Sequence, residues 1–390
     1  MMMDRWMKLK EELQAAAQSL GIDSIGIASV EPFQELKDIL IRHRELGRES
    51  GFEEPDLDKR TNPALLHHNP KSIISIAVAY PSKMSNPPKS EAGARRGIMS
   101  RSAWGEDYHK VLRDRLAKLE AWLRERAPEL AAVSMVDTGE LVDRAVAARA
   151  GIGWGAKNCA VITPEWGSWV YLGEMITNLP LPPDKPLADM CGTCTICIDA
   201  CPTDALVGPG QLDATRCISF ITQTKGMVEE PIMRKMGNRI YGCDTCQTVC
   251  PINKGKNWTH QPELQPDPEL VMPLLTPLLS MGNKEFKERY ASSSSAWRGK
   301  KPIQRNALIA LGNYKEKSAL PNIIQVLQQD PRPVMRGTAA WSLGRIGGMD
   351  AQEALKQAWG KETDEEAKAS IERALDKLGC RIDKLAGSEQ

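Results

Sequence analysis

The sequence predicts three architectures in one chain: a mixed α/β domain, a segment built around iron–sulfur clusters, and a helical repeat region. Helical and strand-like segments alternate in the first, cysteines recur at close spacing in the second, and an alanine- and leucine-rich motif repeats in the third. We place their boundaries at 1–182, 183–258 and 259–390, and the proline-rich LPLPPDKP ends the first domain.

The α/β prediction begins between Asp4 and Leu20, where apolar side chains recur at helical spacing. The next stretch, IDSIGIASV, has the isoleucine and valine content of a strand. A helix followed by a strand is typical of an α/β or α+β domain. Further strands are predicted at 72–80, 132–136, 160–163 and 169–176, and further helices at 107–126 and 140–150.

Two cysteine runs carry the cluster prediction: CxxCxxCxxxCP at 191–202 and CxxCxxxCP at 243–251. A [4Fe-4S] cubane needs four thiolates from several directions, and in two-cluster ferredoxins the last cysteine of each run serves the other cluster. Paired CxxC spacings also build tetrahedral zinc sites, which is the alternative. The crossed, ferredoxin-like arrangement gives one cluster Cys191, Cys194, Cys197 and Cys250, and the other Cys201, Cys243, Cys246 and the only further candidate in the segment, Cys217.

The helical prediction rests on a repeated motif. RNALIALG at 305–312 recurs as RGTAAWSLG at 336–344, and EAKASIERALDKLG at 366–379 is a weaker third copy. A period of about 31 residues with alanine and leucine on one face is typical of a short α-solenoid of HEAT-like repeats. Such stacks usually present a surface to a macromolecule.

Composition narrows the class of protein. Ten cysteines, with no apolar signal core at the start, indicate a reducing, cytoplasmic location and no disulfide framework. No stretch approaches the length of apolar residues needed to span a membrane. The net charge of +1 does not indicate a nucleic-acid partner, so any basic surface must be local.

Asp137 is the candidate acid of the first domain. It follows a predicted strand, and a carboxyl group at a strand end often lies at the mouth of a pocket, where partial burial raises its pKa for acid catalysis. Composition alone favours the alternative that Asp137 caps the following helix. The glycines at 151, 153 and 155 follow a helix, so they do not form a dinucleotide fingerprint. With Lys157 and Asn158 they either admit a bulky ligand or form a glycine-rich turn.

Several motifs together resemble the epoxyqueuosine reductase family: SRSAWGEDYHKVL at 100–112, VDTGELVDRAVAARAGIGWGAKN at 136–158, ITPEWGSWVYLGE at 162–174, GNRIYGCDTCQTVCPIN at 237–253, the eight cysteines and the HEAT-like tail. The resemblance implies a cobalamin-dependent enzyme that removes the epoxide oxygen of epoxyqueuosine at the tRNA wobble position. It also implies a cobalamin-binding catalytic domain similar to that of reductive dehalogenases.

The resemblance further implies residue roles. Asp137 would donate the proton that assists loss of the epoxide oxygen, and Tyr108 and His109 would line the same pocket. Contacts to cobalamin are implied for Arg60, Ser100, Tyr108, His109, Asp137, Lys157, Asn158, Cys159, Ala160, Cys243 and Asp244.

The sequence lacks the DxHxxG motif whose histidine would bind cobalt from below, because Leu112 stands where the glycine would be. We therefore expect base-off cobalamin without a protein histidine ligand, a state that is easier to reduce. The two clusters and the acid would provide the electrons and a proton for a two-electron, two-proton conversion of the epoxide to an alkene and water. An external low-potential donor must reduce the clusters, and we expect a monomer.

The tRNA partner implies basic contacts. Lys254 and Lys256 follow the last cluster cysteine, and TQTKG at 222–226, with Thr222 and Lys225, is expected to border the substrate entrance. A basic strip is expected from Arg298, Lys300, Lys301 and Arg305, with a solvated charged face as the alternative. Two roles are possible for four tryptophans, stacking on RNA bases or packing in the core: Trp104, Trp154, Trp166 and Trp169.

Two other functions fit the same motifs. The first is a corrinoid enzyme resembling reductive dehalogenases that acts on a small halogenated molecule. The second is an electron-transfer scaffold without its own active site, whose repeats dock a redox partner.

Overall fold

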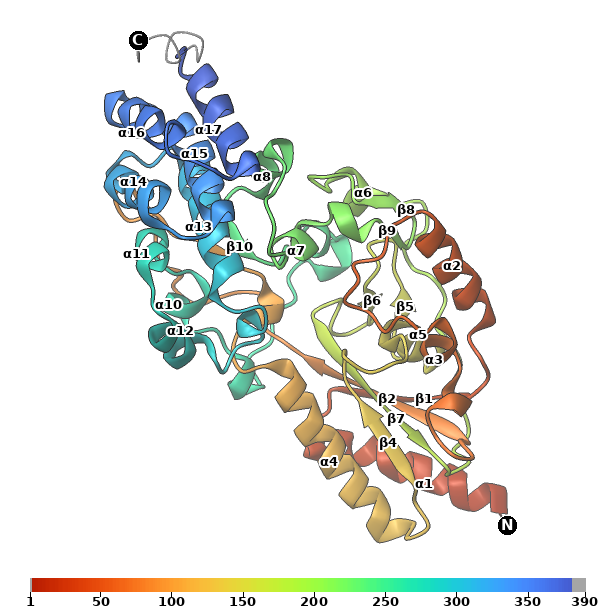
Figure 1. Cartoon of the computed structure of the whole chain (residues 1–390). Helices are drawn as coiled ribbons and strands as arrows, with labels where there is room; N and C mark the ends of the chain where they lie inside the picture. Colours follow the sequence, from red (N-terminus) through yellow and green to blue (C-terminus); the bar gives the residue numbers. More distant parts are fainter. Residues whose placement is uncertain (1, 381–390) are drawn as a thin grey trace. The chain divides into compact units, whose positions relative to one another are not determined.

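The computed structural model describes residues 2–380 (Figure 1). These residues form two compact units that the chain enters more than once. The first unit contains residues up to 83, 105–217 and 244–265, and the second contains 84–104, 218–243 and the residues from 266 onward. The boundaries expected at 182 and 258 do not separate these units, since the cysteine segment contributes to both.

A four-stranded antiparallel sheet is the centre of the first unit. Its order is β1 (Ser24–Ala28), β2 (Ser72–Ala79), β7 (Val170–Thr177) and β4 (Ala132–Met135). Every residue of β2 is buried, which explains why SIISIAVA is an unbroken run of apolar and small residues. The strands expected at these places are confirmed.

Helices cover both faces of this sheet. On one face lie α1 (Met2–Ala16) and α4 (Tyr108–Arg126) (Figure 1). Their leucines, such as Leu13 and Leu116, pack in one cluster with Ile74 and Ile76 of β2. On the other face, α5 (Asp143–Arg149) packs Val146 and Ala147 against the alternate residues of β2 and β7. The remaining elements of this unit are η1 (Ala17–Leu20), α2 (Gln34–Glu45), α3 (Leu57–Thr61), η2 (Pro63–Leu65), β5 (Trp154–Gly155), β6 (Val161–Ile162), α6 (Ile196–Asp199), β8 (Leu206–Gly208), β9 (Gln211–Leu212), η4 (Ala214–Arg216), α9 (Thr245–Thr248), η5 (Pro251–Asn253) and η6 (Pro262–Leu264).

The second unit is mostly helical. A two-stranded parallel ladder joins β3 (Ile98–Met99) to β10 (Arg239–Tyr241). The predicted repeats are confirmed as α13 (Lys300–Tyr314), α15 (Pro333–Ile346) and α17 (Glu365–Lys377). The other helices are α7 (Ile218–Ile221), α8 (Glu230–Met236), α10 (Pro268–Val271), α11 (Leu275–Ser280), α12 (Asn283–Tyr290), α14 (Leu320–Gln329) and α16 (Met349–Trp359).

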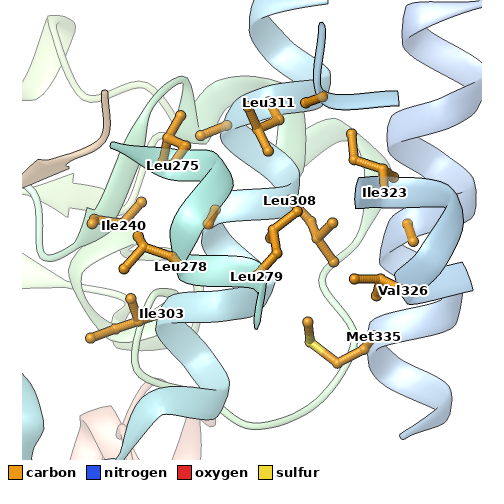
Figure 2. Close-up of a cluster of buried hydrophobic side chains, with 14 of the residues drawn as sticks. Ile240, Leu275, Leu278, Leu279, Ile303, Leu308, Leu311, Ile323, Val326 and Met335 are labelled. Carbon is orange, nitrogen blue, oxygen red and sulfur yellow. The ribbon is translucent and has the colours of Figure 1, made fainter. Parts of the chain in front are cut away.

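Figure 2 shows the core that these helices share. Leu308 of α13 lies among Leu278 and Leu279 of α11 and Val326 of α14. The stretch of α13 from Pro302 to Gly312 is buried throughout, and its polar side chains there, such as Gln304 and Arg305, bind backbone carbonyls. Among residues 2–380, no helix is long and apolar enough to cross a membrane.

Candidate active site and cluster-binding cavity

The Asp137 carboxylate lies two residues beyond β4, on backbone with a φ of +48°. The Tyr108 hydroxyl donates to its Oδ2 at 2.7 Å, and His109 Nε2 lies 3.2 Å from the same oxygen. Both partners belong to the first turn of α4, which the Asp107 side chain caps at its amino-terminal end. The start of α4 therefore holds Asp137 in place.

His109 bridges two carboxylates. Its Nδ1 lies 2.7 Å from Asp107 Oδ1, and its Nε2 faces Asp137. Burial lowers the pKa of His109, but the hydrogen bonds and charges of Asp107 and Asp137 outweigh it and raise that pKa to about 9. At neutral pH the ring is an imidazolium that donates from both nitrogens.

The two carboxylates are held ionised. Burial raises the pKa of Asp137, but the hydrogen bonds from His109 and Tyr108 are stronger in sum, so that pKa lies below its ordinary value. The pKa of Asp107 is lowered in the same way, against burial, by its bonds to His109. The proton of this group is therefore on His109 at rest.

Asp137 does not cap a helix. The next helix, α5, begins at Asp143, its N-cap position is Val142, and no side chain caps it. The cap alternative was wrong because the residues between Asp137 and Asp143 form a loop where the sequence suggested a helix from residue 140.

A cavity of about 390 Å³ lies beside this loop. Burial lowers the pKa of its Arg60 guanidinium. The side chain of Asp137 is 52% exposed, so it is accessible to a molecule in the cavity. The lining consists of residues 52–55, Arg60 and 137–144.

Two further carboxyl groups lie under the loop, and sequence reasoning missed both. Glu174 of β7 is 1% exposed, and its Oε2 has no hydrogen-bond partner. Burial, with Asp143 and Asp137 nearby, raises its pKa well above the ordinary value, so Glu174 is neutral. Burial and the charge of Asp137 likewise raise the pKa of Asp143 to about 6. A glutamate inside an otherwise apolar strand was the available signal.

Aromatic rings support the tyrosine that contacts Asp137. The Tyr108 ring stacks on Tyr171 with centroids 4.6 Å apart and planes within 8°. Tyr171 stacks in turn on Tyr80 at 4.4 Å. Gln247 of α9, between two cluster cysteines, donates to the Tyr80 hydroxyl at 3.3 Å. This contact series joins the cysteine segment to the acid within the first unit.

The first predicted cluster set surrounds one cavity of about 160 Å³. Apolar and backbone groups from Ala156, Asn158, Ile162 and Ile252 complete its wall. The Lys157 ammonium donates to the carbonyl oxygens of Gly192, at 2.5 Å, and Cys194, at 3.0 Å. These two bonds hold the loop at 191–194, which carries two of the cysteines, against the cavity. The cysteines at the cavity are Cys191, Cys194, Cys197 and Cys250.

The other cysteines are divided between the units. Cys201, Cys217 and Cys246 belong to the first unit, whereas Cys243 is the last residue of a second-unit segment and Asp244 begins the next first-unit segment. No disulfide is formed by the cysteines of residues 2–380. Backbone hydrogen bonds lower the pKa of Cys201 despite its burial, which favours the thiolate that a metal binds.

The other residues predicted to contact cobalamin or RNA are spread over both units. Cys159 is a partly buried residue at a φ of +66°, its carbonyl accepts from Arg144, and Ala160 donates to Asn158 Oδ1. Lys256 donates to the carbonyl of Pro164, and Lys254 is exposed. Ser100, Thr222 and Lys225 belong to the second unit.

Two of the expected tRNA contacts are buried. Thr222 is 0% exposed, and its hydroxyl donates to Ser219 and accepts from Gly242. Arg305 is 1% exposed and donates to the carbonyls of Ile221 and Gly226. Arg305 therefore cannot contribute to a basic strip, because its fork binds the backbone of a neighbouring loop. All four candidate stacking tryptophans are core residues, namely Trp104, Trp154, Trp166 and Trp169.

Comparisons with known proteins agree with these regions. The family described as epoxyqueuosine reductase QueG, DUF1730, matches residues 60–138. A 4Fe-4S double cluster binding domain matches 190–253, and HEAT repeats match 298–376. The segment with the cysteine runs is thus a double-cluster iron–sulfur domain, and the ferredoxin-like and repeat predictions are confirmed.

The relatives that match nearly the whole chain are epoxyqueuosine reductases. An epoxyqueuosine reductase from Bacillus cereus is 60% identical over 95% of this chain and 98% of its own length. One from Bacillus subtilis is 57% identical over 95% of this chain and 96% of its own. A crystal structure of an epoxyqueuosine reductase with an epoxyqueuosine-modified tRNA-Tyr stem loop has a TM-score of 0.94, at 56% identity over 96% of this chain and all of that one. A further structure, from Bacillus subtilis with its catalytic aspartate loop swung out of the active site, has a TM-score of 0.93.

Proposed function

This chain belongs to the epoxyqueuosine reductase family and is an oxidoreductase, and we propose that it reduces epoxyqueuosine to queuosine in tRNA with Asp137 as the acid. The observation that carries the acid assignment is the contact of Asp137 with the His109 imidazolium at the edge of a cavity. Neither a small-molecule dehalogenase nor a scaffold without an active site is favoured by the relatives, which share one name over nearly the whole chain.

The proposed proton path runs from His109 through Asp137 to the epoxide oxygen. A carboxylate that is ionised at rest cannot itself donate, and the His109 imidazolium, whose Nε2 lies 3.2 Å from Asp137 Oδ2, holds the proton that can be transferred. As negative charge develops on the leaving oxygen, Asp137 would deliver a proton to it and take one from the imidazolium. Tyr108 would keep the carboxylate oriented during this exchange.

Cobalamin is the proposed electron-delivering cofactor at the cavity. When bound, it would supply the two electrons needed to break both carbon–oxygen bonds of the epoxide, and the second proton of the released water would come from solvent. Arg60 and the backbone of residues 137–144 line the space where it would be held. Both ring nitrogens of His109 face carboxylates, so neither is available to bind cobalt, which fits the expectation of base-off cobalamin.

The clusters would reduce this centre one electron at a time. The four cysteines at the 160 Å³ cavity fit the first cluster, and the crossed assignment leaves Cys201, Cys217, Cys243 and Cys246 for the second. An external low-potential donor would reduce the clusters. We propose that the protein is a cytoplasmic monomer. We also propose that Lys225, Lys254 and Lys256 contact RNA, because these lysines carry positive charge and two of them, Lys225 and Lys254, are exposed.

The test is an anaerobic reaction. Reconstituted protein is incubated with cobalamin, a low-potential reductant and tRNA that carries epoxyqueuosine, and the nucleosides are analysed by mass spectrometry. Cobalamin-dependent loss of one oxygen mass is expected. An unchanged nucleoside, with intact clusters and bound cobalamin, would contradict the proposal.

A further inference from the structure

Trp297 is an exposed indole that the core does not explain. It is 53% exposed, whereas every other tryptophan among residues 4–380 is buried or only partly exposed. It follows a short 3-10 turn, Ser294–Ala296, and precedes α13 of the repeat region. An exposed indole of this size offers an apolar face and a polar edge to a ligand.

The indole is fixed in place. Its Nε1 donates to Gln223 Oε1 at 2.7 Å, and the Arg298 guanidinium lies 4.9 Å from the ring centroid. Arg298 Nε also donates to the Gln223 carbonyl at 3.1 Å. We call Gln223, Trp297 and Arg298 the Trp297 platform. Because these contacts already order the Trp297 side chain, stacking of a ligand on the ring would cost the protein little additional conformational entropy.

The loop beneath the platform is also anchored. Gln223 Nε2 donates to the Ser219 carbonyl, and the buried Arg305 fork binds the loop on both sides of Gln223, at Ile221 and Thr224. The platform is therefore a rigid surface, built on the repeat helix that carries Arg305.

The two sequence segments that form the platform are rich in basic residues. The two segments that form it, TQTKG at 222–226 and WRGKK at 297–301, contain Lys225, Arg298, Lys300 and Lys301 and no carboxylate. Lys225 and Lys301 are exposed. An exposed aromatic ring on segments that also carry exposed lysines suits a nucleobase flanked by phosphates.

We infer that the Trp297 platform stacks an unpaired base of the tRNA substrate while Lys225 and Lys301 contact the flanking phosphates. This inference rests on the proposed function, because it takes the tRNA of that reaction as the ligand. The base contributes its π-face, so stacking would add affinity without reading the base identity.

The test measures binding of a labelled anticodon stem-loop by fluorescence anisotropy to the full chain with its clusters. Trp297→Ala is expected to raise Kd by about tenfold or more, and Trp297→Phe, which keeps an aromatic face, by far less. Trp297→Ala should leave the slope of log Kd against log salt unchanged, whereas Lys301→Ala should reduce its magnitude by about 0.7. Trp122→Ala is the control, since Trp122 of α4 also has an arginine, Arg126, over its ring at 3.9 Å.

An unchanged Kd in Trp297→Ala, or equal weakening in Trp297→Phe or Trp122→Ala, would overturn the inference. Slower reduction of the clusters by a protein donor, with unchanged RNA affinity, would also overturn it and assign the surface to a protein. Turnover of epoxyqueuosine by the unsubstituted chain tests the proposed function separately. If that chain binds the stem-loop through Trp297 without turnover, only the proposed function fails.

Discussion

His109 Nε2 lies 3.2 Å from Asp137 Oδ2, although 28 residues separate them in the chain. The helix that carries His109 packs on the sheet, and the strand that precedes Asp137 is the edge strand of that sheet, so folding brings the two side chains together. The pair places a proton on the imidazole and an ionised carboxylate beside the cavity. The predictions below follow from this pair and from the other buried polar groups.

Asp137→Asn removes the group that accepts the imidazolium proton and passes it on. We expect the clusters and cofactor to be retained and the single-turnover rate to fall by about 10²–10⁴-fold, the usual contribution of a general acid. Nucleoside mass spectrometry measures the rate, and visible absorbance reports the clusters. Glu11→Gln, which alters an exposed carboxyl of α1 outside the cavity, is the control and should leave the rate unchanged. Full activity in Asp137→Asn would remove Asp137 from the acid role.

The pH–rate profile tests the role of His109. Its pKa of about 9 means that the shared proton is present below that value, so the rate of the chemical step should decline only as the pH rises through about 9. In His109→Gln the proton must reside on Asp137 itself, and the decline should move to acidic pH. Tyr108→Phe keeps the imidazolium and should keep the limb near 9. An alkaline limb at the same pH in His109→Gln would show that His109 does not hold the proton.

Glu174→Gln tests the neutral buried carboxyl. The folded-state pKa of Glu174 is raised, so the folded state retains a proton that the unfolded state loses above its pKa of about 4.5. This group therefore lowers the free energy of unfolding by about 1.4 kcal/mol per pH unit as the pH rises from there toward the folded pKa. Urea titrations between pH 5 and 8 should show this slope in the parent and not in the variant. Parallel slopes would mean that Glu174 is ionised in the folded state.

Lys157→Met tests closure of the first cluster loop. The ammonium donates to Gly192 and Cys194, and hydrogen bonds from a charged donor each contribute about 1.5–3 kcal/mol. We expect faster loss of cluster absorbance in the presence of a chelator, with half of the iron released first. Lys185→Met removes an exposed lysine that lies shortly before Cys191 in the sequence, and it should leave the rate of cluster loss unchanged. Equal rates in both variants would contradict the role of Lys157.

Arg305→Lys tests the buried fork in α13. Burial lowers the pKa of Arg305 to about 10, and its guanidinium donates to four different residues. A lysine cannot reproduce this planar set, so we expect a loss of about 3–5 kcal/mol of stability, measured by urea unfolding. Lys301→Arg, at an exposed position of the same helix, should change it by less than about 0.5 kcal/mol. A stability loss under about 1 kcal/mol in Arg305→Lys would show that the fork is dispensable.

The sequence by itself determined the features that local spacing encodes. The cysteine runs identify the double-cluster domain, since ligands a few residues apart must lie in one turn. The repeated motif predicted α13, α15 and α17, and the apolar run from Ser72 predicted β2, because each period reflects one buried face.

The tertiary structure decided what depends on distant contacts. Arg305 belongs to a basic-looking sequence yet lies buried, because the loop at 221–226 offers carbonyls to its fork. Trp297 is exposed, whereas the four tryptophans proposed for stacking are buried in the packed interior. The protonation of His109 and Asp137 likewise depends on a contact between α4 and the loop after β4. Burial and charge act through space, and one sequence position does not reveal which other residues surround it.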